Sequence, residues 1–138
     1  MGKRRKAREV VLQALYELEF SDRTGEEILE DQVGRRSSSV ETVDYARDLF
    51  RRTLEQREDL DHKIAAALQN WELARVSIID KNILRFALAE ILFFPQIPSK
   101  VIINEAIEIA HKYSSSDAGR FVNGILDRFV GQYREEAD

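Results

Sequence analysis

A cluster of cations near the N-terminus is the group of side chains best suited to chemistry, and that chemistry is anion binding. The cluster consists of Lys3, Arg4, Arg5, Lys6 and Arg8, and residues 1–8 contain no acid. Neighbouring cations repel one another, and such clusters commonly meet an anion, above all nucleic-acid phosphate. Charge alone leaves a solvated tail as an equal alternative.

The charge of the chain is unevenly distributed. The 138 residues carry −4 in total, from 21 Lys and Arg against 25 Asp and Glu. Residues 1–8 hold +5, so residues 9–138 hold −9. The sequence therefore predicts an acidic body with a basic N-terminal arm.

Helical spacing places two more side chains beside these cations. The apolar residues of segment 3–20 recur at the period of a half-buried helix: Ala7, Val10, Val11, Ala14, Leu15 and Leu18. Gln13 and Tyr16 fall on the opposite face, together with Arg5 and Lys6. Cations bind phosphate, an amide reads base edges and an aromatic ring stacks on a base, as recognition of single-stranded RNA requires. This face is our candidate RNA-binding surface.

A second candidate contact lies near the other end of the chain. Phe121 falls about 100° from Val122 on a helical wheel, at the margin of the apolar stripe of its helix. Arg120 and Lys112 supply cations nearby. Packing at the edge of the core is the alternative to RNA contact for this ring.

Catalytic and metal chemistry is not expected. The chain has no Cys, which excludes disulfides, thiol catalysis and Cys-containing zinc sites. Its two histidines, His62 and His111, are predicted at the surface, and no Gly-rich phosphate loop, GxSxG or HExxH motif is present. The carboxylates fit solvated charged faces. We therefore expect no catalytic residue, no cofactor and no metal.

Membrane insertion and export are also not expected. No apolar run approaches the roughly 20 residues that span a bilayer, and no apolar segment of a signal peptide follows the basic start. A cytoplasmic protein with no membrane partner is the expectation.

The elements that must position these residues are helices. Apolar periodicity predicts helices over residues 3–20, 26–33, 40–58, 59–70, 81–94, 100–113 and 118–135. Segment 81–94 is apolar on nearly every side and is expected at the centre, and residues 34–39 are expected to form a loop. Ser77, Ser99 and the run 114–117 are expected to cap the helices that follow them. The fold class is all-α, a compact bundle of about seven helices.

Four segments, in this order and spacing, resemble the NusB family of bacterial transcription antitermination factors. They are Arg5-Lys6-Ala7-Arg8-Glu9 with Gln13-Ala14-Leu15-Tyr16, NWELARVSIIDKNILRFALAEILF at 70–93, IPSKVIINEAIEIAHKY at 97–113 and RFVNGILD at 120–127. Each alone is largely a helix pattern. Together they extend the resemblance over nearly the whole chain, residues 1–138.

The resemblance implies one RNA-binding domain of two helical subdomains, about residues 1–75 and 76–138. It implies binding to boxA RNA in leader and ribosomal RNA transcripts, and a heterodimer with NusE, a small-subunit ribosomal protein. It also implies a place among other Nus factors on RNA polymerase. By position, the arginine-rich start maps to residues 3–8, and the boxA contacts include Gln13, Tyr16, Arg120 and Phe121. The partner face is placed near Leu18, Phe20, Glu90 and Asp117.

Three positions depart from the family pattern, and two rival functions stay open. Ala89 stands where the family often has Tyr, His111 replaces a cation, and Ala118-Gly119 occupies a position where a small polar residue is common. The first rival is a helical adaptor whose basic arm only solubilises it. The second is the front domain of a ribosomal RNA cytosine methyltransferase. The length of the chain makes this rival less expected, because no residues follow Asp138 for a cofactor-binding domain.

Overall fold

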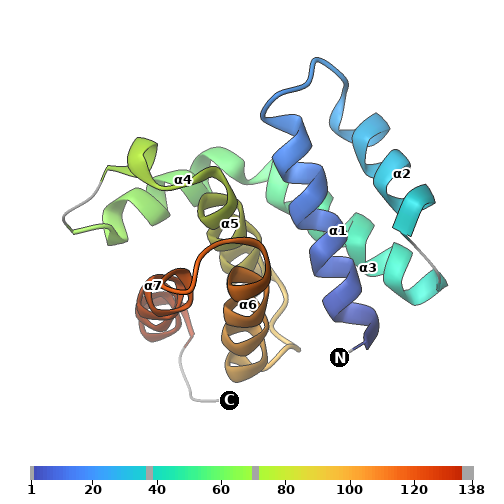
Figure 1. Ribbon diagram of the computed structural model, residues 1–138. Helices are drawn as coiled ribbons and strands as arrows, with labels where there is room; N and C mark the ends of the chain where they lie inside the picture. The colour runs from blue at the N-terminus through green and yellow to red at the C-terminus, as the bar shows by residue number, and fades with distance from the viewer. Residues whose placement is uncertain (1, 37–38, 70–71, 135–138) are drawn as a thin grey trace. The chain divides into compact units, whose positions relative to one another are not determined.

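A computed structural model describes residues 2–36, 39–69 and 72–134 and shows them as helices and connecting segments (Figure 1). The elements are α1 (Gly2–Leu18), α2 (Gly25–Arg36), α3 (Val40–Glu55), α4 (Arg57–Ala67), the 3-10 helix η1 (Leu73–Arg75), α5 (Ile78–Phe93), α6 (Ser99–Tyr113) and α7 (Ala118–Tyr133). No strand occurs in these ranges. The all-α prediction is confirmed.

Helices α1 to α3 belong to one compact unit, residues 1–55. Helix α1 packs against both α2 and α3. The predicted apolar stripe is buried from Ala7 to Leu15, whereas Leu18 is half-buried. Leu12 lies outside that stripe and is also fully buried, because α1 is covered by two helices instead of one.

Helix α2 is longer than predicted. It continues through residues 34–36, where the sequence predicted a loop, and residues 37–38 of that loop lie outside the described ranges. The last turn is held by the side chains of Arg35, whose guanidinium donates to Asp31 at 3.1 Å, and Arg36, whose Nε donates to Gln32 at 3.3 Å. Both pairs are four residues apart, the spacing at which side chains meet on a helix.

Two parallel ion pairs connect α2 with α3. The guanidinium of Arg47 contacts both carboxylate oxygens of Glu30, at 2.9 and 2.7 Å, and that of Arg51 contacts both oxygens of Glu26, at 2.9 and 3.0 Å. These hydrogen bonds lower the pKa of both carboxyls. All four side chains remain substantially exposed, so each pair adds little stability.

Helices α4 to α7 form a second unit, residues 56–138, built around α5. Every residue from Asn82 to Ile91 is buried, because α4, α6 and α7 all pack against this helix. The prediction that this apolar segment is central is confirmed.

An ion pair between buried Arg85 and half-buried Asp61 joins α4 to α5. Arg85 donates to both carboxylate oxygens of Asp61, at 2.7 and 2.9 Å, and to Oδ1 of Asn82 at 2.8 Å. The buried side chains of Leu60 and Ile64 add apolar contact on the same helix. These interactions assign α4 to the second unit, whereas the division expected near residue 75 assigned it to the first.

The helix caps follow the predictions only in part. Ser77 caps α5 as expected, since its Oγ accepts the Asp80 N–H at 3.1 Å. Ser99 is instead the first residue of α6, and its Oγ accepts from Arg134. Asp117 precedes α7 but makes no capping hydrogen bond through its side chain. The expected ends of the helices at residues 70 and 135 lie outside the described ranges.

Arg134 closes the carboxyl end of α5. Its guanidinium donates to the backbone carbonyls of Glu90, Ile91, Phe94 and Ile97 at 2.6–3.2 Å. The last carbonyls of a helix lack partners within the helix, so a multidentate donor satisfies several of them at once. The residue that follows α7 therefore fixes the end of the central helix of the second unit.

Candidate nucleic-acid interface

The basic N-terminal cluster forms the first two turns of α1, and part of it is anchored to α3. Lys3 pairs with Glu41, and this hydrogen bond lowers the pKa of the Glu41 carboxyl. The guanidinium carbon of Arg4 lies 4.8 Å from the centre of the Tyr45 ring, a cation–π distance. Lys3 and Arg4 nevertheless remain exposed.

The structure corrects the expectation for Arg8. This side chain was predicted to contact RNA, but only 1% of its surface is exposed. Its guanidinium carbon lies 5.7 Å from the centre of the same Tyr45 ring. Because a buried cation cannot reach a phosphate in solvent, Arg8 stabilises the packing of α1 against α3.

Tyr45 is a residue that the sequence analysis missed. Its ring makes cation–π contacts with the guanidinium groups of both Arg4 and Arg8, which lie one helical turn apart on α1. The i, i+4 spacing of two arginines is a weak sequence signal for such a shared ring. Nothing in the sequence identifies the ring itself, which lies on another helix.

The predicted RNA-binding face of α1 is accessible along its length. Lys6 is exposed, Arg5 and Gln13 are half-buried, and Tyr16 is 38% exposed. The face therefore presents, in order, cations, an amide and an aromatic ring.

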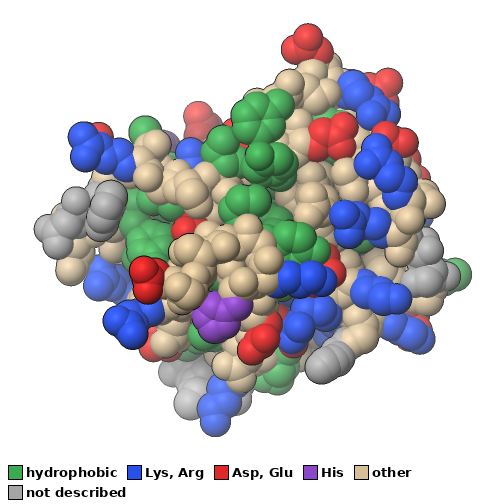
Figure 2. All heavy atoms as spheres, viewed as in Figure 1, with side chains coloured by type: hydrophobic (Ala, Val, Ile, Leu, Met, Phe, Trp, Pro, Cys, Tyr) green, Lys and Arg blue, Asp and Glu red, His purple; other side chains and the backbone are tan. Residues whose placement is uncertain are grey.

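An exposed aromatic pair ends this face. The rings of Tyr16 and Phe20 meet edge to face with centroids 5.2 Å apart, and Phe20 is 66% exposed. Figure 2 shows hydrophobic side chains gathered over the carboxyl end of α1. Tyr16 was assigned to RNA and Phe20 to the protein partner, but the structure places both in one patch. Leu18, also assigned to the partner, is half-buried beside them in sequence.

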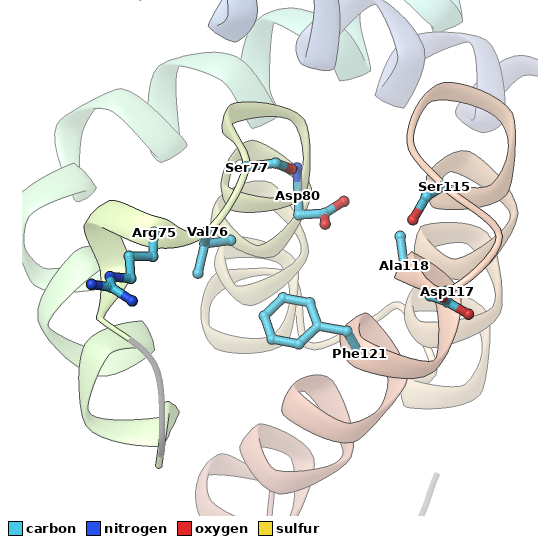
Figure 3. A pocket seen from close by; sticks show the side chains of 8 residues that line it. All are labelled: Arg75, Val76, Ser77, Asp80, Ser115, Asp117, Ala118 and Phe121. Carbon is cyan, nitrogen blue, oxygen red and sulfur yellow. The ribbon is translucent and has the colours of Figure 1, made fainter.

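The second unit carries a hollow of about 260 Å³ on its surface. It is lined by Arg75, Val76, Ser77, Asp80, Ser115, Asp117, Ala118 and Phe121 (Figure 3). Figure 3 shows the Phe121 ring pointing from α7 toward Val76 and the start of α5. Phe121 is half-buried and Asp117 is exposed, so a predicted RNA contact and a predicted partner contact line the same hollow.

Close packing of His111 on Gly119 positions the start of α7. A Cβ atom at Gly119 would lie 2.3 Å from Nε2 of His111, so any larger residue there would displace the imidazole. His111 and Gly119, which both depart from the family pattern, are thus in contact. Arg120 is exposed next to this contact, and Lys112 is exposed with its Nζ 5.3 Å from the centre of the Tyr113 ring.

Glu90 requires a second correction. It was placed on the partner face, but it is fully buried within α5. Its position on the central helix explains this, since α5 is covered from Asn82 to Ile91. Of the four residues assigned to the partner, Phe20 and Asp117 are exposed.

The described residues contain no group of three or more His, Cys, Asp and Glu side chains that could hold a metal ion. None of the helices in these residues is long and apolar enough to cross a membrane.

Comparison with known proteins gives consistent matches. The model of the NusB family matches residues 5–131. The transcription antitermination protein NusB of Salinibacter ruber is 42% identical over 131 residues, covering 94% of this chain and 82% of that protein. The protein of the same name from Myxococcus xanthus is 40% identical over 132 residues, covering 93% of this chain and 94% of its own length.

Solved structures share the fold. NusB of T. maritima superposes with a TM-score of 0.89 at 39% identity, over 96% of this chain and 93% of that one. A crystal structure of the antitermination factors NusB and NusE in complex with dsRNA matches with a TM-score of 0.88 at 24% identity, over 96% of this chain and 99% of that one. At that identity the second likeness shows the fold alone.

Proposed function

The chain belongs to the NusB family, and we propose that it is a transcription antitermination factor that binds boxA-type single-stranded RNA in leader and ribosomal RNA transcripts. It pairs with NusE and acts in Nus-factor complexes on RNA polymerase, in the cytoplasm. Its activity is binding, without catalysis.

The observation that carries the proposal is the accessible face of α1. Exposed cations at its start neutralise phosphates and supply affinity that depends on salt but little on sequence. Gln13 and Tyr16 lie further along the same face, where an amide and a ring discriminate between unpaired bases. Phosphate contacts thus position the strand and base contacts specify it.

The second unit contributes a stacking ring and two cations. Phe121 is partly accessible at its hollow, and a base that stacks on such a ring gains about 1–3 kcal/mol. Arg120 and Lys112 are exposed and supply phosphate contacts near this ring in sequence. The unit binds RNA through these three side chains.

A basic protein partner fits the rest of the surface. Residues 9–138 carry −9, and complementary charge favours association with a basic protein. Phe20 offers the apolar anchor, since exposed aromatic residues are enriched at the centres of interfaces. The crystal structure named above contains NusB with NusE, and we assign the same partner to this chain.

The proposal is tested by removing three of the accessible cations of α1. The triple variant Arg4→Ala/Arg5→Ala/Lys6→Ala should bind a boxA-type RNA less tightly, with a salt dependence shallower by about 2 in slope, since each lost phosphate contact removes about 0.7. Fluorescence anisotropy over a salt series measures both quantities. Lys100→Ala, which removes one exposed cation from α6, is the control and should leave the slope unchanged. A helical adaptor without RNA function would show the same weak binding for all three proteins.

A further inference from the structure

Arg36 at the end of α2 lies beside the start of α1. The two helices pack against each other in one unit, and Figure 1 shows them side by side. Lys6, Glu9 and Val10 of α1 and Arg36 of α2 line one surface hollow of about 190 Å³. The start of α1 and the end of α2 therefore form two walls of a common trough.

A chain of hydrogen bonds fixes Arg36 in this wall. Its Nε donates to Oε1 of Gln32 at 3.3 Å, and Nε2 of Gln32 donates to Oε1 of Glu17 on α1 at 3.0 Å. Gln32 is buried, whereas the two residues that it connects are partly or fully exposed. Arg36 itself is exposed, and it lines the hollow together with Lys6.

Arg35 adds a second cation on the same turn. It pairs with Asp31 at 3.1 Å while 60% of its side chain stays exposed, so a phosphate can approach it without prior unfolding of the turn. Figure 2 shows Lys and Arg side chains over the first turns of α1 and, with Asp and Glu side chains among them, over α2. The alternative is that the two arginines only stabilise the carboxyl end of α2 through the helix dipole. That effect would not depend on the neighbouring α1.

The charge balance of the hollow indicates what it binds. Arg36 and Lys6 both line it, and a guanidinium can bind two phosphate oxygens at once. Glu9 contributes a carboxylate to the same hollow, which weakens its attraction for a free anion. If α1 already holds the RNA strand, the neighbouring phosphate has a high local concentration at the hollow. A weak attraction is then enough for it to bind.

We propose that Arg35 and Arg36 bind the sugar-phosphate backbone of single-stranded RNA next to the segment recognised by α1, so that the strand continues from α1 onto α2. The inference rests on the proposed function. It makes the RNA footprint longer than the recognised sequence and adds affinity that is independent of base identity.

The experiment compares two RNAs on the full-length chain. One is a boxA-type oligonucleotide, and the other is the same sequence extended by about six uridines at each end, enough for several phosphate contacts. The wild type should bind the extended RNA more tightly. Arg35→Ala/Arg36→Ala should bind the short RNA as the wild type does and lose the gain from the extension. Its salt slope on the extended RNA should fall by about 1.4, or about 0.7 per arginine.

Two further variants keep the test decisive. Lys100→Ala removes an exposed cation of the other unit and should retain the gain. Arg36→Gln preserves a polar side chain next to Gln32 and should lose about half of the slope change even if the double alanine variant is unstable. If the double variant retains the gain, or loses affinity for both RNAs equally, the inference is wrong. If the wild type binds neither RNA, the proposed function fails with it.

Discussion

Truncation of Arg8 should damage stability and leave the salt dependence of RNA binding intact, whereas truncation of Lys6 should do the reverse. The two cations are two residues apart in one helix, yet Arg8 is 1% exposed and Lys6 is exposed. Removing a buried side chain of this size costs about 2–4 kcal/mol of unfolding free energy, through lost packing and the lost contact with Tyr45. Removing the exposed lysine costs about 0.5 kcal/mol or less.

The effect on binding follows from counting phosphates. If Lys6 makes one contact, Lys6→Ala lowers the salt slope by about 0.7, so the advantage of the wild type shrinks about 2.5-fold between about 50 and 200 mM salt. Arg8→Ala makes no such change when it is measured at a temperature where the variant is folded. Urea unfolding followed by circular dichroism gives the stability, and anisotropy with a boxA-type RNA gives the slope. An Arg8→Ala variant of wild-type stability with a shallower slope would refute the reasoning.

Three further variants test the ion pairs. Asp61→Ala should cost about 3 kcal/mol in urea unfolding, because it leaves the Arg85 guanidinium buried without its bidentate carboxylate. Glu26→Gln/Glu30→Gln should flatten the pH dependence of stability. Their arginine partners lower both pKa values from 4.5, so the stabilisation is full above about pH 4.5 and is lost as pH falls through the lowered values. Glu41→Gln should steepen the salt dependence of RNA binding by about 0.7, because it releases a lysine to phosphate.

The Asp61 prediction has a matched control, and each of the other two has an outcome that would contradict it. Asp59→Ala breaks the exposed pair with Lys63, four residues on, and should cost about 0.5 kcal/mol or less. An equal loss at Asp59 and Asp61 would contradict the role of burial. For the α2–α3 pairs, unchanged pH dependence in the double variant would show that other carboxyls set the acid limit. For Glu41, an unchanged slope would show that Lys3 does not reach the RNA.

Periodicity predicted the helices well because most of the stability of a helix comes from burying one face. The central position of α5 was predictable for the same reason, since an apolar segment without a polar face must be covered on all sides. The end of α2 was not predictable, because Gly34 and the two arginines after it are typical of a loop. Only the hydrogen bonds of the two arginines to residues four positions earlier show the extra turn.

The sequence predicted which side chains share the exposed face of α1, but it did not predict which charged side chains are buried. Lys6, Gln13 and Tyr16 lie as the wheel indicated, since a face opposite the apolar stripe points away from the core. Arg8 was assigned to RNA as part of the basic N-terminal cluster, and Glu90 was assigned to the partner face from the family resemblance. Neither basis reports burial, which depends on neighbours distant in sequence. For Arg8 that neighbour is Tyr45, on a helix 37 residues further along the chain.

The most direct test of the central claim is the discrimination between a boxA-type RNA and a scrambled RNA of equal composition, titrated with and without NusE at two salt concentrations. We expect modest affinity for the chain alone and a preference of about tenfold or more for the boxA-type RNA in the complex, or about 1.4 kcal/mol. Equal binding of both RNAs by the complex would contradict specific recognition.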